Sequence, residues 1–173
     1  SIPIAQFVSG GQTGADRAAL DWATAHKYRV GGWCPKGRRA EDGFIDERYP
    51  LREADSAGYR QRTRLNVRDS DGTLIVNLGE LEGGTLLTRD VAGQIGRPSL
   101  VTQLDGGVFP EIGAWVLAWL RQNRIATLNV AGPRESRQPG IYRLTWALLD
   151  AVESASCEET ASRREGGTDI PPR

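Results

Sequence analysis

One stretch near the amino terminus decides the fold: Ile4-Ala-Gln-Phe-Val-Ser9 leads directly into Gly10-Gly-Gln-Thr-Gly14. The first six residues predict a short buried strand. The segment from Ala15 to His26 has the helical spacing of apolar residues that predicts a helix packed on a core. A strand that passes through a glycine-rich turn into a helix is the opening unit of a parallel α/β fold.

The rest of the chain repeats this alternation of strands and helices. Further strands are expected at 30–33, 73–78, 99–102 and 125–130. Further helices are expected at 59–67, 83–95, 110–122 and 142–152. The continuous apolar centre of 73–78 is typical of a parallel strand buried on both faces. The sequence therefore predicts a Rossmann-like three-layer α/β/α fold with a mainly parallel sheet of about five strands.

Length and composition indicate one domain without a global attraction for charged polymers. The 173 residues suit one well-packed domain, expected at 1–152, and the polar segment 153–173 is expected to be a disordered tail. The formal net charge is zero, so neither nucleic acid nor an anionic membrane is an expected partner. Two cysteines and one histidine predict no disulfide framework and no metal site, and they favour a reducing, cytoplasmic location.

Three turns share one design, in which a strand is followed by small residues, then a polar residue and a helix. They are Ser9 to Gly14, Glu82 to Thr85, and Gly132 to Ser136. Backbone amides without side chains in front of them approach an anion closely, and a helix N-terminus adds about half a positive charge. Each turn alone could be a tight junction, but parallel strands end at one sheet edge, so we expect a shared site for a small phosphorylated ligand. The expected ligand-binding residues in these turns are Gly10, Gly11, Gln12, Thr13, Gly14, Gly83, Gly84, Thr85, Gly132, Arg134 and Ser136.

Several polar side chains outside the glycines complete the predicted site. Lys36 and Arg38 lie in a long polar stretch, 34–57, where they either neutralise a ligand oxyanion or belong to a solvated loop. Asp16 and Asn77 are expected to contact a sugar or the edge of a ring, and Trp33 could stack on that ring. The Gly-x-Gly-x-x-Gly and Gly-Lys-Ser/Thr patterns are missing, which disfavours a standard NAD enzyme or P-loop NTPase.

The combined motifs resemble the circularly permuted YpsA-like family of the SLOG superfamily, whose members are described as molybdenum carriers. The matching segments are 9–16, 32–38, 66–77, 82–85, 129–136 and 139–142. The resemblance implies a binding or carrier protein for a nucleotide or pterin-type ligand such as molybdenum cofactor, with no intrinsic cofactor. It also implies a homodimer or higher homo-oligomer, and the apolar face of 110–122 could pack either on a twin or on the sheet.

The broader superfamily contains the LOG phosphoribohydrolases, which supply an alternative function. By comparison with them, Arg62 matches the position of a catalytic arginine, but the expected glutamate falls on Thr88. A threonine hydroxyl does not titrate near neutral pH and cannot serve as that acid or base. A hydrolase of N-glycosidic or phosphate bonds would need other acids, and the candidates are Glu41, Asp42, Asp71, Glu82 and Glu135.

Overall fold

The computed structural model describes residues 1–165 and contains a central parallel sheet of five strands. The strands are β1 (Gln6–Val8), β2 (Arg29–Gly31), β7 (Gly72–Asn77), β8 (Ser99–Gln103) and β9 (Thr127–Ala131). Their order across the sheet is β2-β1-β9-β7-β8, and every neighbouring pair is parallel. The predicted Rossmann-like α/β fold is confirmed.

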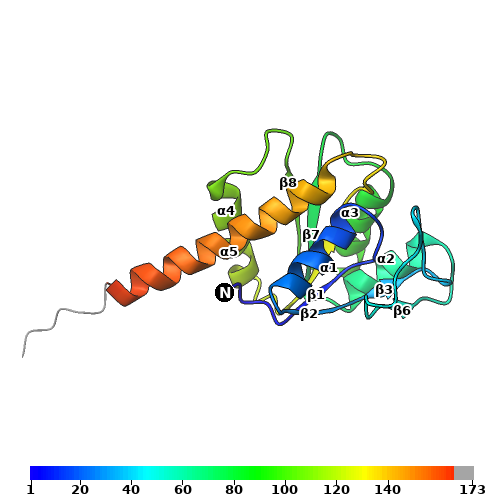
Figure 1. Ribbon diagram of the computed structural model, residues 1–173, viewed down its shortest axis with the longest axis horizontal. Helices are drawn as coiled ribbons and strands as arrows, with labels where there is room; N and C mark the ends of the chain where they lie inside the picture. Colours follow the sequence, from blue (N-terminus) through cyan, green and yellow to red (C-terminus); the bar gives the residue numbers. More distant parts are fainter. Residues whose placement is uncertain (166–173) are drawn as a thin grey trace, which may run out of the picture.

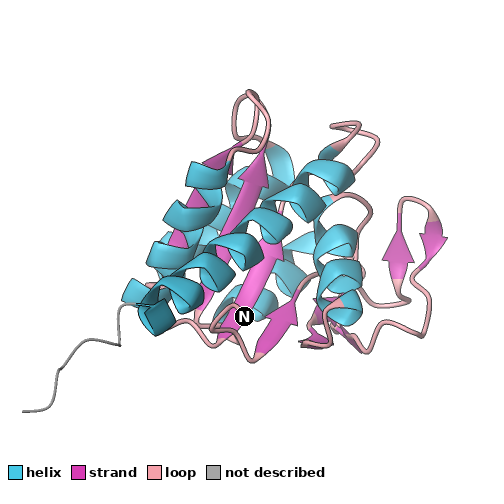
Figure 2. Cartoon of the chain, turned by 60° about the vertical axis from the view of Figure 1, so that its left-hand side comes forward, coloured by secondary structure: helices cyan, strands magenta, loops and turns pink. Residues whose placement is uncertain are grey.

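Helices cover both faces of the sheet (Figure 2). Helix α5 (Ile141–Glu165) packs against α1 (Ala15–Ala25) and α4 (Pro110–Gln122) in one layer, and α2 (Tyr59–Arg68) packs against α3 (Gly83–Ile95) in the other. Alternate strand residues such as Phe7 and Leu74 join the first layer in one apolar cluster, as the alternation of side chains along a strand requires. No helix within 1–165 is both long enough and apolar enough to cross a membrane.

The polar stretch after β2 forms a small ordered annex to the sheet. Strand β3 (Trp33–Cys34) pairs with β6 (Arg52–Glu53), and β4 (Arg39–Ala40) pairs with β5 (Gly43–Phe44) as an antiparallel hairpin. A separate apolar cluster holds this segment, consisting of Leu20, Cys34, Ile45, Tyr49 and Leu51. The stretch that composition marks as polar therefore has its own core.

The expected disordered tail at 153–173 is wrong for its first part. Helix α5 continues past Val152 to Glu165 and extends beyond the other helices (Figure 1). The reason is tertiary, because the polar residues of this extension bind the amino-terminal segment. The Glu153 carboxylate accepts a hydrogen bond from the Ile2 amide at 3.1 Å, and the Ser156 hydroxyl donates to the Ser1 carbonyl at 2.7 Å. Residues 166–173 lie outside the described part of the chain.

The apolar face of α4 is used within the chain. Val116, Leu117 and Leu120 are buried in the same cluster as the sheet and α5. Trp115 points away from this cluster and is half exposed. The packing therefore matches the second of the two alternatives, an apolar face directed at the sheet.

Candidate functional site

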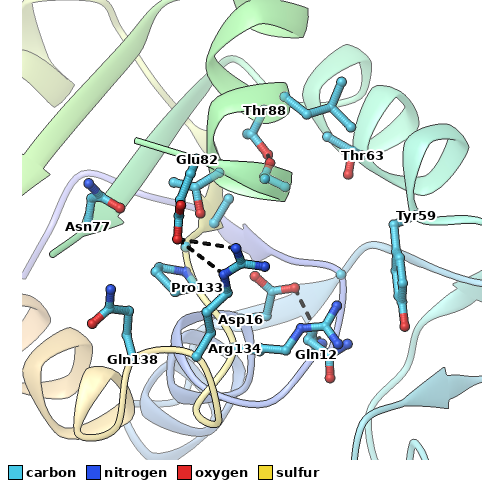
Figure 3. Close-up of a pocket in the computed structure, with 18 of the residues that line it drawn as sticks. Gln12, Asp16, Tyr59, Thr63, Asn77, Glu82, Thr88, Pro133, Arg134 and Gln138 are labelled. Atoms are coloured by element: carbon cyan, nitrogen blue, oxygen red, sulfur yellow. Dashed lines mark hydrogen bonds and ion pairs between the residues drawn. The ribbon is translucent and has the colours of Figure 1, made fainter. Parts of the chain in front are cut away.

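A cavity of about 260 Å³ lies at the carboxyl ends of β1, β9 and β7. The chain leaves β1 and β9 toward the helices of one layer and leaves β7 toward α3 in the other, so the cavity sits at the switch point of the sheet. Figure 3 shows Asn77 and Gln138 on one side of it and Tyr59 and Thr63 on the other. Of the predicted ligand-binding residues, those that line it are Gly10, Gln12, Asp16, Asn77, Gly83, Gly84, Thr85, Gly132 and Arg134.

All three glycine turns contribute to this cavity, although the reason for a glycine differs between them. A Cβ at Gly132 would lie 2.6 Å from both the Ala15 Cβ and the Val76 carbonyl oxygen, so this glycine lets α1, β7 and β9 approach one another. A Cβ at Gly84 would meet no atom within 4 Å. Packing therefore explains the glycine at 132 and leaves open space in front of Gly84.

The amino termini of α1 and α3 differ in their availability to an anion. At α1 the Ala15 amide donates to the Pro133 carbonyl at 3.3 Å, and neither Gly11 nor Gly14 lines the cavity. At α3 the first intrahelical bond runs from the Leu86 amide to the Glu82 carbonyl, so the amides before Leu86 precede the helical ladder. No side chain caps this end, and it lines the cavity. The structure thus directs α3 rather than α1 toward the site.

A buried ion pair forms one wall of the cavity. The Arg62 Nη1 donates to Asp16 Oδ2 at 2.9 Å, and both side chains are largely buried. Burial raises the pKa of the Asp16 carboxyl, and the attraction of Arg62 opposes this rise. Two donors beside the pair, Gln12 Nε2 and Arg62 Nε, are buried without a protein partner. Unpaired buried donors are rare in proteins, so these atoms mark a place suited to an acceptor.

Tyr59 is a site residue that the sequence does not predict. It begins α2, lines the cavity, and carries guanidinium groups on its ring, with Arg62 Cζ at 5.4 Å and Arg134 Cζ at 5.3 Å from the ring centroid. Tyr59 is 39% exposed as a residue. Thr63 on the same helix, and Arg137 and Gln138 after β9, also line the cavity and were likewise missed. Only the last two had a signal, since they directly follow the turn at Ser136.

Threonine and asparagine side chains occupy the wall formed by β7 and α3. Asn77 is buried and donates from Nδ2 to the Gly79 carbonyl at 3.0 Å and to Gln103 Oε1 at 2.7 Å. Thr85 is also buried at the cavity. Thr88, where the predicted resemblance to LOG enzymes places a glutamate, lines the cavity and donates its hydroxyl to the Gly84 carbonyl at 2.8 Å.

The structure does not bring Lys36 and Arg38 to the cavity. The Arg38 guanidinium instead donates to four backbone carbonyls of the annex, those of Ile45, Asp46, Tyr49 and Leu51, at 2.8 to 3.1 Å. Lys36 is exposed on the same annex. Trp33 lines a different cavity, where its indole donates to Asp69 at 2.9 Å. Arg38 therefore serves the local fold, because its fork matches several carbonyls at once.

Thr13 and Ser136 already bind a carboxylate of the protein, that of Glu41. Both hydroxyls hydrogen-bond the Glu41 carboxylate, and the Ser136 amide donates to its Oε1 at 3.2 Å. The predicted phosphate ligands Thr13 and Ser136 thus lie beside the cavity rather than on its wall, in contact with Glu41.

The remaining candidate acids divide between cavity and scaffold. Glu82 lines the cavity and pairs with Arg137 at 3.2 Å. The Glu135 carboxylate accepts the Gly140 and Tyr142 amides at 2.6 and 3.0 Å, which caps α5. Asp71 accepts two amides beside β9, and Asp42 pairs with Arg17 at 2.8 Å. Among the side chains that the structure describes, those of residues 1–162, no three His, Cys, Asp or Glu gather in an arrangement suited to a metal ion.

Comparison with known proteins agrees with this geometry. A crystal structure from Syntrophus aciditrophicus SB, named "Putative molybdenum carrier protein", superposes with a TM-score of 0.85 at 45% sequence identity, covering 87% of this chain and 95% of that one. No functionally curated protein matches significantly. The model of the circularly permutated YpsA SLOG family matches residues 7–153, which include every cavity-lining residue. The chain belongs to the circularly permutated YpsA SLOG family.

Proposed function

We propose that this protein is a binding or carrier protein for a phosphorylated heterocycle of the nucleotide or pterin type. The observation that carries the proposal is that one cavity joins an uncapped helix N-terminus to an accessible aromatic ring. The first would hold a phosphate and the second a planar ring system.

The phosphate would bind at α3. The amides of Gly83, Gly84 and Thr85 precede the helical ladder, and the positive end of the helix dipole lies at the same place. Open space in front of Gly84 lets a phosphate oxygen come close to the backbone. Arg134 lines the same cavity and supplies a positive charge.

The heterocycle would bind near Tyr59. Its ring is amphipathic and partly exposed, and a planar base or pterin would stack on it by taking the place of one of the two guanidinium groups that lie over the ring. The unpaired donors Gln12 Nε2 and Arg62 Nε suit acceptor atoms on the ring edge, and the Asp16 carboxylate suits a ring N–H. These groups would hydrogen-bond the polar ring edges that both purines and pterins have.

The 45% identical relative is named a molybdenum carrier, and the cargo that we propose on this basis is molybdenum cofactor, which carries the metal on a phosphorylated pterin. The lining residues suit its organic part, since they offer amides, hydroxyls, arginines and an aromatic ring. Recognition would therefore go through the phosphate and the pterin rather than through protein ligands to the metal.

Placing a negative charge at the N-terminus of α3 tests the proposed phosphate site. Gly84→Asp introduces a carboxylate where nothing obstructs it, and an acid in the first turn favours the helix, so the variant should fold. We expect titrations of AMP and GMP to lose at least about tenfold in affinity through repulsion of the phosphate. Gly93→Asp is the matched control, because Gly93 lies on the same helix, is exposed, and also has open space.

Two outcomes would contradict the carrier proposal. Equal binding by Gly84→Asp and Gly93→Asp would show that α3 does not hold the phosphate. Steady release of free base from AMP or GMP, abolished in Glu82→Gln, would identify a hydrolase, since Glu82 and Arg62 both line the cavity. Independently of these titrations, mass spectrometry of small molecules released from the purified protein would identify the cargo.

A further inference from the structure

The tip of the β4–β5 hairpin places a carboxylate in a ready-made anion site. Glu41 hydrogen-bonds the hydroxyls of Thr13 and Ser136, its Oε1 accepts the Ser136 amide at 3.2 Å, and Arg134 Nη1 lies 4.0 Å from its Oε2. Thr13 follows β1, whereas Arg134 and Ser136 follow β9. Three residues from two distant loops therefore direct four donor groups at one carboxylate.

The donor set is one that also binds phosphoryl oxygens. Two hydroxyls, a backbone amide and a guanidinium recognise an oxyanion whether it is a carboxylate or a phosphate. Partial burial acts to raise the pKa of Glu41, but the hydrogen bonds from Ser136 and Thr13 outweigh burial and hold that pKa below its ordinary value. The surroundings thus stabilise a negative charge.

This anion site adjoins the proposed ligand cavity. Arg134 contributes to both, and Gln12 connects them, since its Oε1 accepts the Glu41 and Thr13 amides at 2.9 and 3.0 Å while its buried Nε2 has no partner. Tyr59 lines the main cavity and also a neighbouring one of about 560 Å³, of which Glu41 is a wall. Glu41 therefore stands between the two cavities.

Polar contacts of its tip, and no pairing with the main sheet, hold the hairpin that carries Glu41. Strands β4 and β5 pair with each other and with no other strand of the described chain, and Figure 2 shows a small hairpin standing away from the main sheet. Phe44 on β5 is 62% exposed. Beside Glu41, Asp42 docks the tip through Arg17 at 2.8 Å. Withdrawal of the tip would expose little apolar core.

We propose that Thr13, Ser136 and Arg134 form a second oxyanion subsite, which Glu41 occupies internally and which receives a second phosphoryl group of the ligand when the hairpin withdraws. The inference rests on the proposed function, because the two phosphoryl groups belong to one ligand. The main cavity, at about 260 Å³, is slightly smaller than common ligand pockets, and withdrawal of Glu41 would join it to its neighbour.

The first experiment compares AMP with ADP and GMP with GDP in calorimetric titrations. Glu41→Gln removes the competing charge, so we expect the diphosphates to bind at least about tenfold more tightly than to the natural chain, with monophosphate affinity nearly unchanged. Glu47→Gln is the matched control, because it removes one negative charge from an exposed position of the same annex and leaves both Glu41 and the Asp42–Arg17 contact in place. An equal increase in diphosphate affinity in the two variants would show that the effect comes from net charge alone, and would overturn the inference.

The second experiment separates this inference from the proposed function. Inorganic phosphate is titrated into ¹⁵N-labelled protein while the Ser136 amide resonance is followed. A saturable shift in Glu41→Gln but not in Glu47→Gln is expected, and its absence from Glu41→Gln overturns the subsite even if AMP binds normally. A phosphate response at Ser136 without any nucleotide binding would instead retain the subsite and refute the proposed function.

Discussion

The Asp16 carboxylate and the Arg62 guanidinium meet at 2.9 Å directly over Gly10, with the two side chains only 7% and 13% exposed. A Cβ at position 10 would lie 1.4 Å from Arg62 Nη1, so the glycine makes room for the arginine. Asp16 lies in the first turn of α1 and Arg62 on α2. The pair therefore connects the two helical layers across the edge of the sheet.

Breaking this ion pair on one side should destabilise the fold strongly. Arg62→Met leaves the Asp16 charge buried without its partner, and we expect the free energy of unfolding to fall by about 3 to 5 kcal/mol. Because burial already raises the pKa of Asp16, and the loss of Arg62 raises it further, stability is retained at low pH and lost as pH rises through that pKa. Urea denaturation at pH 5 and pH 8 should show the larger loss at pH 8.

A double variant and a surface control complete this test. Asp16→Asn combined with Arg62→Met should recover part of the loss, since no charge stays buried. Arg64→Met changes an exposed arginine of the same helix and should alter the free energy by less than about 0.5 kcal/mol. Similar losses in Arg62→Met and Arg64→Met would show that the pair contributes nothing.

Replacement by alanine should have different effects on stability at two glycines of the site. Gly132→Ala places a methyl group 2.6 Å from the Val76 carbonyl oxygen, which belongs to a buried strand and cannot move aside, so we expect a loss of about 1 to 3 kcal/mol or more. Gly84→Ala adds a methyl group in open space on a helix and should be neutral or stabilise by up to about 1 kcal/mol. Thermal unfolding of both variants measures the difference, and a loss at Gly84 equal to that at Gly132 would refute it.

Arg38 should prove structural rather than ligand-binding. Lysine keeps the charge of Arg38 but cannot reach four carbonyls in a plane, so Arg38→Lys should destabilise the fold by about 1 to 3 kcal/mol. Arg39→Lys, at the exposed neighbouring position, should be neutral. If Arg38→Lys were as stable as the natural chain but bound AMP less tightly, Arg38 would instead be a ligand residue.

The stabilising contribution of Glu41 should disappear in acid. Its pKa is depressed in the folded chain, so the contribution is present above the unfolded pKa, close to 4.5, and is lost as pH falls through the lower folded value. Hydrogen exchange of the 39–44 amides should therefore be faster in Glu41→Gln than in the natural chain at pH 7, with the difference vanishing once the pH falls below the folded pKa of Glu41. Glu47→Gln, at an exposed position of the annex, should show no difference at either pH. A pH-independent effect of Glu41→Gln would rule out its charge as the cause.

The sequence predicted the sheet well because its signals are local. Strand β7 is apolar throughout its centre, and a glycine-rich turn follows each of β1, β7 and β9. The tail at 153–165 was mispredicted because its helix is stabilised by distant partners, Ser1 and Ile2, which no local pattern reveals. Tyr59 has no local signal for the same reason, since only the packing of α2 against α3 and β3 directs it to the cavity.

The sequence by itself determined that glycine-rich turns with exposed amides gather at one edge of the sheet. The small residues follow parallel strands, and the carboxyl ends of parallel strands meet at one edge, because the rules of strand order and crossover handedness leave few other arrangements. Only the tertiary structure decided which of those backbone amides stay accessible. In the folded chain the Pro133 carbonyl accepts the Ala15 amide at the start of α1, and the Glu41 carboxylate accepts the Thr13 and Ser136 hydroxyls. The N-terminus of α3 has no such side-chain cap. The physical reason is that hydrogen-bond donors are satisfied by whichever acceptor folding brings nearest, and that acceptor can come from anywhere in the chain.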